Sequence, residues 1–375
     1  MRIAINTRLL LPHRLDGIGW FTAETTRRIV QSHPEHQFYL LFDRRPSPEF
    51  LYASNVVPVV LCPQARHPLL WQLYFEVATP WALKHHHIDL YLSPDGMMPL
   101  HTGVPTLSVI HDLNFEHATD NLRPSHQRYM KYFFPRFARK ASRVATVSEY
   151  SKCDIAATYG VPLDKIDVVY DGAHEAYHPL SEAEKEHVRS KYTEGHPYLI
   201  FISTILRRKN LANLLLAFDR VKDADQRSLK LVVAGSRAWW GEELATAYGQ
   251  MQHKEDVVFV GRQETQELSS LLAASEMLVY PSLFEGFGIP ILEAMHAEVP
   301  VICSSTTSMP EVGGDAARYI NPHSPEDIAQ AIMELQDAAM RDALVEKGRK
   351  QRTLFSWDKT ADLLWESLMH AYSDR

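Results

Sequence analysis

The sequence predicts an α/β protein made of two domains, each with a parallel sheet. Three observations support this fold class: short β-rich runs alternate with stretches of helical period, the alternation occurs in two series, and a polar segment separates the series. Such alternation implies parallel strands whose connecting helices cover both faces of a sheet. With 375 residues, 45% hydrophobic and 23% charged, the chain is long enough for two complete cores.

The first series of apolar runs occupies the N-terminal half of the chain, and we expect it to form a domain over residues 1–180. Its members are bounded by polar or turn residues, as expected of buried strands. They are RIAIN 2–6, FYLLF 38–42, VVPVVL 56–61, DLYLS 89–93, TLSVIHD 106–112, VATVSE 144–149 and IDVVY 166–170.

The second series follows the charged segment 181–197, which we interpret as the interdomain connection. We expect the second domain to span residues 181–356. The tail over 357–375 has the apolar spacing of a further helix. The runs of the second series are YLIFIS 198–203, LKLVVAG 229–235, VVFVG 257–261, MLVYPS 277–282 and VPVICS 299–304.

Composition excludes several classes of protein. No run approaches eighteen consecutive apolar residues and the N-terminus has no signal-peptide core, so we expect a cytoplasmic protein. The net charge of −7 argues against a nucleic-acid partner. Cys62, Cys153 and Cys303 are isolated and lack metal-ligand spacing, so we expect buried free thiols.

The most informative stretch is YPSLFEGFGIPILEAMHAEVP, residues 280–300, which follows a strand-like run. It places Glu285 and Glu293 on either side of a Gly-Phe-Gly turn. With Pro290 at the first helical position, Glu293 falls in the first turn of a helix and Glu285 stays in the preceding loop. Both acids then face one crevice, where free N–H groups of the helix start suit a phosphate or sugar hydroxyls. A capping role for Glu293 and a solvated Glu285 are the alternative.

Several motifs together resemble the retaining glycosyltransferases of family 4. Besides the stretch above, the family-like segments run in the family's order along nearly the whole chain. They are RLDGIGWFT 14–22, VIHDLNF 109–115, ATVSEYSK 145–152, VVYDGAH 168–174, YLIFISTILRRKNLANLLLAF 198–218, VPVICSSTTSMPEVGGDAARYINP 299–322 and FSWDKTA 355–361. The resemblance implies the GT-B architecture, two facing Rossmann-like domains, with the last helix crossing back onto the N-terminal domain.

The resemblance also implies roles for individual residues. Arg208 and Lys209, in the loop after the first strand of the second domain, would meet the negative charge on the departing diphosphate. Glu285 would contact the donor sugar and Glu293 the ribose hydroxyls, with the backbone of Gly286, Phe287 and Gly288 lining the same pocket. A solvated basic run is the alternative for Arg208 and Lys209.

Other candidate donor-binding positions are less typical of the family. Ser203 and Thr204 stand where its members usually carry Gly and often Arg. The backbone around Gly235, and around Gly261 and Arg262, lies at two predicted strand ends where it can read a base edge.

Two N-terminal features complete the implied site. Gly17 and Gly19 match a dinucleotide fingerprint poorly, because Thr22 replaces its third glycine, but they suit a loop that approaches a phosphate. His111, at the end of a predicted strand, corresponds to the family's cleft histidine near the donor sugar; a structural histidine is the alternative.

The sequence thus predicts transfer of a hexose, with retention, from a nucleotide sugar to a glycan or lipid-linked saccharide. Similarity to the mannosyltransferase branch that builds bacterial O-antigen favours GDP-mannose, with UDP-hexoses as the alternative. An epimerase with the same fold and a non-catalytic sugar-binding scaffold are the competing classes. We expect no metal and no cofactor, because cations and helix dipoles can carry the leaving-group charge.

Three further features carry weaker predictions. Asp223 and Asp225 form a D-x-D string that we interpret as a solvated turn. The side chains of His85, His86 and His87 point in different directions around a helix and cannot all bind one metal ion, so we expect these histidines on the surface. Residues 128–143 hold six basic residues, five aromatic rings and no acid. This segment suits peripheral association with an anionic membrane, or else a helix whose aromatic rings pack in the core.

Overall fold

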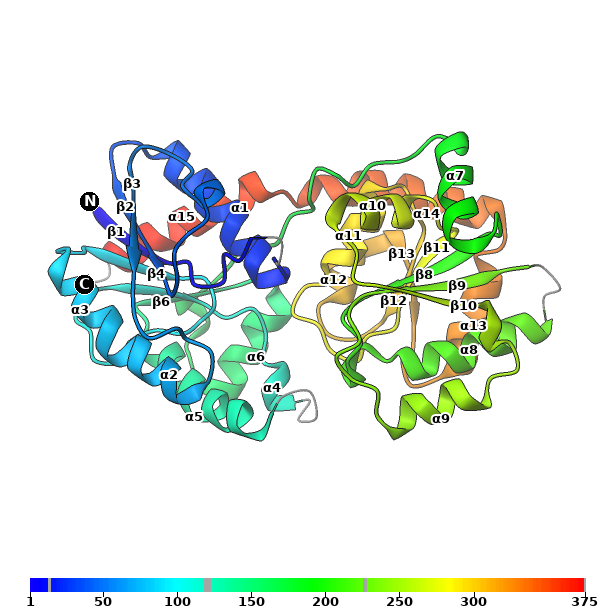
Figure 1. Cartoon of the computed structure of the whole chain (residues 1–375), viewed down its shortest axis with the longest axis horizontal. Coiled ribbons are helices and arrows are strands. Elements are labelled where there is room, and N and C mark those ends of the chain that lie inside the picture. The colour runs from blue at the N-terminus through cyan, green and yellow to red at the C-terminus, as the bar shows by residue number, and fades with distance from the viewer. Residues whose placement is uncertain (13–14, 118–122, 225–227, 374–375) are drawn as a thin grey trace. The chain divides into compact units, whose positions relative to one another are not determined.

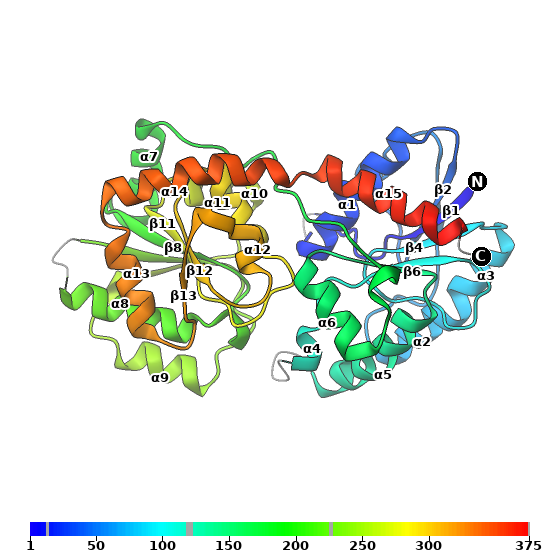
Figure 2. The ribbon, with the colours of Figure 1, turned by 180° about the vertical axis from the view of Figure 1, so that it is seen from behind.

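The chain divides into two compact units, drawn in Figures 1 and 2 of the computed structural model. The structure describes residues 1–12, 15–117, 123–224 and 228–373. The first unit comprises Met1–Asp171 with Ser356–Arg375, and the second comprises Gly172–Phe355. The sequence places the boundary at residue 180, whereas the contacts divide the chain after Asp171.

The polar segment 181–197 forms a helix of the second unit. Helix α7 (Glu182–Thr193) begins with a capping box in which the side chains of Ser181 and Glu184 each bond the other's backbone N–H. Lys191 Nζ lies 2.8 Å from Glu267 Oε1 on another helix of the same unit. The high charge of this segment therefore reflects an amphipathic surface helix.

A sheet of seven parallel strands runs through the first unit in the order β3-β2-β1-β4-β5-β6-β7. The order reverses between β1 and β4, so the loops after these strands lie at a topological switch point, where such sheets bind ligands. Strand β3 contains Pro58, which an edge strand tolerates. The bounds are β1 Arg2–Asn6, β2 Gln37–Phe42, β3 Val56–Val60, β4 Leu90–Ser93, β5 Thr106–Val109, β6 Arg143–Thr146 and β7 Ile166–Val168.

Helices cover both faces of this sheet (Figures 1 and 2). Helices α1 and α15 pack together on one face, and α2, α3, α5 and α6 cover the other. In the part of this unit that the structure describes, 3-10 turns also occur at Pro48–Phe50 and Leu163–Lys165. The bounds are α1 Gly17–Ser32, α2 Pro68–Leu73, the π-helical segment η2 Tyr74–Ala78, α3 Thr79–His85, α4 Asn114–His117, α5 Pro124–Lys140, α6 Glu149–Tyr159 and α15 Trp357–Ser373.

Helix α15, at the C-terminal end of the sequence, belongs to the first unit. Its Trp357 ring lies 6.3 Å from the ring of Phe21 on α1, and its Asp358 Oδ1 accepts a hydrogen bond of 2.5 Å from Arg28 Nε. Thr360 Oγ1 donates to the carbonyl of Tyr170 after strand β7. The regularly spaced apolar residues of α15 therefore form one face of the helix, and this face is buried against the N-terminal sheet layer.

The second unit contains a six-stranded parallel sheet with the order β10-β9-β8-β11-β12-β13. Five strands match the predicted runs. The sixth, β13, was not predicted, because its four residues include Arg318 and Tyr319 and it lies at the sheet edge. The bounds are β8 Tyr198–Ile202, β9 Lys230–Ala234, β10 Val257–Gly261, β11 Met277–Tyr280, β12 Val301–Ser304 and β13 Ala317–Ile320.

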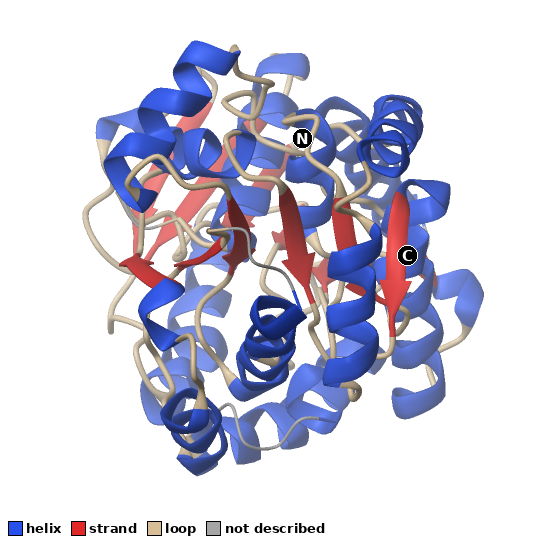
Figure 3. Cartoon of the chain, turned by 90° about the vertical axis from the view of Figure 1, so that its right-hand side faces the viewer, coloured by secondary structure: helices blue, strands red, loops and turns tan. Residues whose placement is uncertain are grey.

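Helices also lie on both sides of the second sheet, as Figure 3 shows with strands in red and helices in blue. Two parallel sheets covered by helices confirm the predicted α/β class. Besides α7, the α-helices are α8 Leu211–Ala224, α9 Glu242–Gln250, α10 Thr265–Ala273, α11 Ile289–His296, α12 Met309–Gly313, α13 Pro325–Glu334 and α14 Ala338–Gln351; the 3-10 turns are η5 Arg207–Lys209, η6 Lys254–Asp256, η7 Gly314–Ala316 and η8 Arg352–Leu354.

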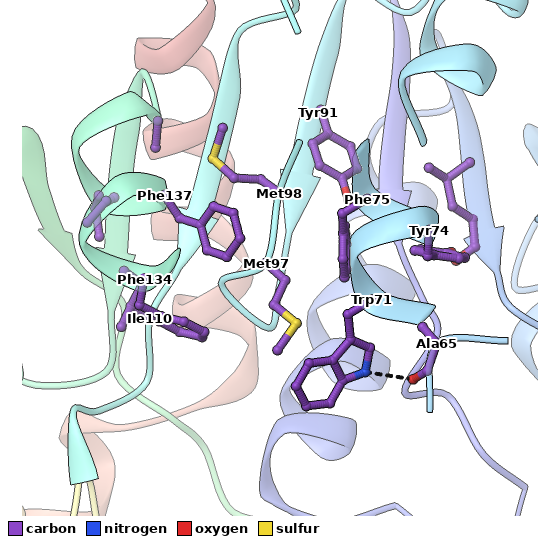
Figure 4. Close-up of a cluster of buried hydrophobic side chains, with 14 of the residues drawn as sticks. Ala65, Trp71, Tyr74, Phe75, Tyr91, Met97, Met98, Ile110, Phe134 and Phe137 are labelled. Atoms are coloured by element: carbon purple, nitrogen blue, oxygen red, sulfur yellow. Dashed lines mark hydrogen bonds between the residues drawn. The ribbon is translucent and has the colours of Figure 1, made fainter. Parts of the chain in front are cut away.

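The core beneath α2 and α5 joins aromatic side chains to the first sheet (Figure 4). Trp71 and Phe75 come from the α2 side and Phe137 from α5, and Tyr91 comes from strand β4. Trp71 Nε1 donates to the carbonyl of Ala65 at 2.9 Å, so the polar atom of a buried indole is satisfied. These contacts fix the two helices on one face of the sheet.

The expectation of three buried thiols is wrong for two of the cysteines. Cys303 is buried, but Cys62 and Cys153 are exposed, because they lie in the loop after β3 and on the outer side of α6.

Helix α5 runs through Pro135 without interruption, and its rings at Tyr129, Phe134 and Phe137 are buried. The core interpretation is therefore correct for these three rings.

Candidate active site

Glu285 lies at the centre of a buried polar cluster at the carboxyl edge of the second sheet. Lys209 Nζ donates to Glu285 Oε1 at 2.5 Å, and Arg208 NH1 donates to Glu285 Oε2 at 3.1 Å. The hydroxyl of Tyr280, the last residue of β11, donates to Glu285 Oε1 at 2.8 Å and accepts from Lys209 Nζ at 3.1 Å. Three of the predicted site residues therefore meet in one place, together with a tyrosine.

Local structure brings these side chains together. Strands β8 and β11 are neighbours, so the loops after them lie side by side at the same edge. The 3-10 turn η5 carries Arg208 and Lys209 after β8, and Asn210 then adopts a left-handed conformation with φ of 62°. Leu283 N donates to the carbonyl of Arg208 at 2.7 Å, which ties the two loops together.

The electrostatics of the cluster keep Glu285 ionised. Burial opposes ionisation, but the charges of Lys209 and Arg208 and the hydrogen bond from Lys209 outweigh it and lower the pKa of Glu285 to about 2. Burial, together with the charge of Glu285, raises the pKa of Tyr280 well above its usual value. The cluster therefore holds one anion, two cations and a neutral hydroxyl at neutral pH.

The loop after strand β12 hydrogen-bonds to the backbone of the loop that carries Glu285. Thr307 Oγ1 accepts from the backbone N–H of Glu285 at 3.3 Å, and Ser308 Oγ lies 3.0 Å from the carbonyl of Glu285 and 2.9 Å from that of Phe287. Thr307 has φ of 57°, an unusual value for a β-branched residue. Gly286 and Phe287 are buried in the same loop.

Glu293 hydrogen-bonds with Tyr177, a residue outside this cluster. Helix α11 begins after Gly288, which has φ of 107°, so Pro290 is the second helical residue and Glu293 falls in the second turn. The expectation that Glu293 lies in the first turn is wrong, because the glycine and not the residue before the proline ends the turn. The side chain of Glu293 is half-buried, and burial raises its pKa to about 7. The hydrogen bond with Tyr177 acts in the opposite direction, but its effect on the pKa is smaller.

The predicted base-reading positions form a compact backbone cluster. Gly235 follows strand β9, its N–H donates to the carbonyl of Gly261 at 2.8 Å, and Ser203 N donates to the carbonyl of Ala234. A Cβ on Gly235 would lie 1.8 Å from the carbonyl oxygen of Ser203, so only glycine fits there. Thr204 Oγ1 accepts from Ser236 Oγ at 3.3 Å, and Arg262 is exposed beside this edge.

The first unit brings its predicted residues together in a second cluster. Helix α1 starts at Gly17, and Asp16 caps it by accepting from Gly19 N at 3.2 Å. His111 lies just beyond strand β5, with its ring 4.8 Å from that of Phe21 on α1. His111 Nε2 donates to the carbonyl of Pro94 at 2.8 Å. Burial lowers the pKa of His111, so the ring is neutral at pH 7 and Nδ1 remains an acceptor.

Sequence reasoning missed three residues of these clusters. The sequence pattern identified Tyr280 only as the last residue of a strand. Its position five residues before Glu285 was the available signal that it could contact this acid. Thr307 lies in the family-like segment 299–322, but its backbone conformation has no sequence signal. Tyr177, the partner of Glu293, lies in an irregular segment, and only the tertiary structure pairs the two.

The side chains of the D-x-D string and of the three consecutive histidines make structural contacts. Asp223 is in the last turn of α8 and its Oδ1 lies 3.0 Å from His253 Nε2, while Asp225 lies outside the described residues. His85 stacks on Trp81 with ring centroids 4.8 Å apart, and His86 lies against Tyr39. Within the described ranges, no group of three His, Cys, Asp or Glu side chains is placed to hold a metal ion.

A cavity of about 530 Å³ opens at the amino ends of β4 and β5, the opposite edge of the first sheet from His111. Its lining includes Asp89, Thr106 and Lys140. None of the predicted site residues contributes to it, and the carboxyl edges of the sheets remain the better candidates for ligand binding.

Two family models together match most of the chain. The model for "Glycosyltransferase Family 4" matches residues 15–176, and the model for "Glycosyl transferases group 1" matches residues 182–351. The first match covers the cluster around His111 and the second covers the cluster around Glu285.

Curated relatives and solved structures agree with these matches. The chain is 29% identical over 360 residues to O-antigen chain mannosyltransferase B of Escherichia coli, covering 93% of this chain and 94% of that one. It is 27% identical over 290 residues to O-antigen chain mannosyltransferase RfbU of Salmonella typhimurium, covering 76% and 77%. The fold is similar to that of WaaG, a glycosyltransferase involved in lipopolysaccharide biosynthesis, with a TM-score of 0.75, 16% identity and coverage of 98% and 99%.

Among the described residues, no helix combines the length and the apolar character needed to cross a bilayer. The two parallel-sheet units, the two family models and the similar solved structures lead to one assignment. The chain belongs to family 4 of the glycosyltransferases, with the GT-B fold.

Proposed function

We propose that this glycosyltransferase moves a mannosyl unit, with retention, from GDP-mannose to a glycan or lipid-linked saccharide during synthesis of a cell-surface polysaccharide. The observation that carries the reaction class is the buried cluster of Lys209, Arg208 and Glu285 at the carboxyl edge of the second sheet. The names of the O-antigen mannosyltransferases to which the chain is similar support the sugar and the pathway class.

The cluster suits the charge changes of this reaction. As the bond between the anomeric carbon and the diphosphate oxygen breaks, negative charge develops on that oxygen, and Lys209 and Arg208 are the cations that stabilise it. The acceptor hydroxyl forms the new bond to the anomeric carbon on the same face. Its proton passes to the departing phosphate oxygen, so no protein base is required.

Glu285 serves as a fixed anion in this proposal. Because its pKa is held near 2, it stays ionised and can accept hydrogen bonds from donor-sugar hydroxyls while it holds the two cations in place. Glu293 accepts hydrogen bonds from the ribose hydroxyls of the donor. These hydrogen bonds replace the one between Glu293 and Tyr177 when the donor binds. Neutral His111 offers Nδ1 to a sugar hydroxyl.

We propose further that the reaction uses no divalent metal, since the two cations and the N-terminus of α11 carry the leaving-group charge. Turnover should survive dialysis against EDTA unchanged. Inactivation that only magnesium or manganese reverses would contradict this part of the proposal and leave the reaction class standing.

The donor is tested by comparing nucleotides on the unmodified chain. GDP should raise the melting temperature more than UDP at equal concentration, because stabilisation follows RT ln(1 + [L]/Kd). Transfer from GDP-mannose to a mannose-terminated acceptor, with an α-linked product seen by NMR, completes the test. Transfer only from a UDP-sugar would favour the UDP-hexose alternative, and isomerised sugar without transfer would favour an epimerase.

A lipid-linked acceptor would require the enzyme to work at a membrane. The exposed basic side chains of α5 support peripheral association with an anionic surface, which we include in the proposal.

A further inference from the structure

The cavity at the amino ends of β4 and β5 belongs entirely to the first unit. Its volume of about 530 Å³ lies within the range of small-molecule binding sites. Residues 102–106, from the loop before β5, line it together with Ile88 and Asp89 before β4 and with Lys140 and Ser142 near the end of α5. The function proposed above uses none of these groups for the transfer reaction.

The frame of the cavity is held by the sheet itself. The backbone N–H of Tyr91 donates to the carbonyl of Pro105 at 2.9 Å, and that of Ser142 donates to the carbonyl of Thr106 at 2.9 Å. These bonds tie the start of β5 to its two neighbouring strands. The cavity is therefore preformed, and a ligand that enters it orders little additional backbone.

Three hydroxyl groups of the lining keep unused hydrogen-bonding capacity. Thr102 Oγ1 accepts from Val104 N at 3.1 Å and Ser142 Oγ accepts from Thr106 N at 3.3 Å, so both hydroxyls still have a hydrogen to donate. Thr106 Oγ1 donates to the carbonyl of Val104 at 3.1 Å, so it can still accept. The lining thus offers donors and acceptors to a ligand.

The charged groups of the lining are one acid and one base. Asp89 is half-buried, and its Oδ2 accepts from the backbone N–H of Arg2 at 2.8 Å, which fixes the direction of the carboxylate. Lys140 is exposed and is the last residue of α5. A helix C-terminus carries partial negative charge. The cavity therefore has no excess of positive charge.

Apolar side chains complete the lining. They are Ile88, Met98, Val104 and Pro105. The cavity thus combines aliphatic surface with hydroxyls and a pair of opposite charges. A pyranose ring has the matching character, since it presents C–H groups on its faces and hydroxyls around its rim.

Other classes of ligand fit this lining less well. A phosphate group is bound by several cations or by a helix N-terminus, whereas this cavity has one lysine beside a helix C-terminus. A nucleobase is bound by stacking on an aromatic ring, and none of the described lining residues is aromatic. A divalent cation needs more oxygen ligands than Asp89 supplies.

We infer that this cavity binds a segment of a neutral saccharide chain, at a site separate from the transfer site. Strands β4 and β5 have four residues each, so about 13 Å of sheet separates the cavity from the edge that carries His111. A glycan held in the cavity keeps its free end at a high local concentration near the enzyme. The binding site rests on the cavity alone, and its use during chain elongation rests on the proposed function.

The test measures binding to the full-length protein without any donor, by calorimetry and by saturation-transfer NMR. The probes are a linear α-linked mannopentaose, maltopentaose, methyl α-mannoside and inorganic phosphate. Mannopentaose should bind about tenfold or more tightly than the monosaccharide, because it fills more of the cavity. Phosphate should not displace it, and saturating GDP should leave its affinity unchanged.

Gly103→Leu tests the location of the bound saccharide. A Cβ on Gly103 meets nothing within 4 Å, so leucine adds a side chain at the cavity wall without a clash. The affinity for mannopentaose should fall about tenfold or more. The matched control is Gly249→Leu, because Gly249 is also exposed and also has open space at its Cβ. This control should bind like the parent.

The double variant Asp89→Asn, Lys140→Gln tests the lining charges and leaves the net charge of the protein unchanged. Hydrogen bonds to charged groups are stronger than neutral ones, so the affinity should fall about tenfold. The double variant Glu49→Gln, Lys84→Gln removes one exposed acid and one exposed base elsewhere on the same unit and should bind like the parent. Melting temperatures of all variants check that the fold is retained.

Four results would overturn the inference. They are a parent that binds neither pentasaccharide, a Gly103→Leu protein that binds like the parent, control variants that lose binding equally, and GDP that displaces the saccharide. The last result would assign the saccharide to the transfer site. Binding of maltopentaose without mannopentaose would support the saccharide site and count against a mannosyl product, so the two proposals can fail separately.

Discussion

Lys209 Nζ lies 2.5 Å from Glu285 Oε1, so a strongly buried cation is held against a buried carboxylate before any donor is bound. The side chains are 10% and 8% exposed, which removes most of the solvent screening that weakens surface pairs. An incoming diphosphate would meet cations that are already positioned and partly desolvated. The electrostatic work of assembling the site is therefore done during folding.

Lys209→Ala should lower kcat by about 100-fold or more, because a charge that acts on the leaving group matters mainly in the transition state. Donor KM should change much less. The matched control is Lys222→Ala, which removes a similarly covered lysine that pairs with Asp256 in the same unit. Initial rates across donor concentrations separate the two constants, and a kcat near that of the control would count against a catalytic Lys209.

Glu293→Ala should raise the donor KM and leave kcat nearly unchanged, because ribose contacts are equal in the ground and transition states. In the parent, donor KM should fall as the pH rises through about 7, since the ionised carboxylate is the better acceptor. Glu293→Gln should remove this pH dependence. A donor KM that stays flat with pH in the parent would contradict the assignment.

Stability should respond to pH through the two glutamates in opposite directions. The folded pKa of Glu293 is raised from 4.5 to about 7, so its contribution is present below 4.5 and is lost as the pH rises through 7. Glu293→Gln should therefore stabilise the protein at pH 8 relative to the parent, by on the order of 2 kcal/mol. Urea unfolding at pH 5 and pH 8 measures the difference.

Glu285 provides the opposite case for the same measurement. Its folded pKa is lowered from 4.5 to about 2, so its contribution is present above 4.5 and is lost as the pH falls toward 2. Glu285→Gln should destabilise the protein at both pH 5 and pH 8, because the cations of Lys209 and Arg208 remain buried. Equal pH responses in the two variants would be inconsistent with the opposed shifts.

Gly235→Ala and Gly261→Ala form a matched pair at the ends of neighbouring strands. Both glycines have positive φ, but an added Cβ meets the Ser203 carbonyl at 1.8 Å in the first case and nothing within 4 Å in the second. We expect a loss of about 3 kcal/mol or more for Gly235→Ala and about 1 kcal/mol for Gly261→Ala. Chemical denaturation compares them, and similar losses would mean that the close approach is not maintained.

Thr307 combines an unusual backbone conformation with a contact to Glu285. Thr307→Gly should relieve strain and keep stability within about 1 kcal/mol of the parent, while kcat falls several-fold because the Glu285 N–H loses its acceptor. Thr307→Val keeps the strain, lacks the hydroxyl, and should lower both stability and kcat. If Thr307→Val turned over like the parent, the hydroxyl would have no positioning role.

The sequence by itself determined the α/β class and twelve of the strands, because buried parallel strands need continuous apolar runs. It missed β13, where Arg318 and Tyr319 break the apolar pattern at an edge. It also placed Arg208, Lys209 and Glu285 after strands, and since parallel strands end at one sheet edge, their meeting could be expected.

Other features were decided only by the tertiary structure. The spacing around Pro290 could not show that Gly288 ends the turn and moves Glu293 to the second turn of α11. The composition of residues 128–143 could not separate its buried rings from its exposed cations, because that division depends on which side of α5 meets the sheet. The partners that set the pKa of each glutamate come from distant segments, and sequence spacing carries no information about such contacts.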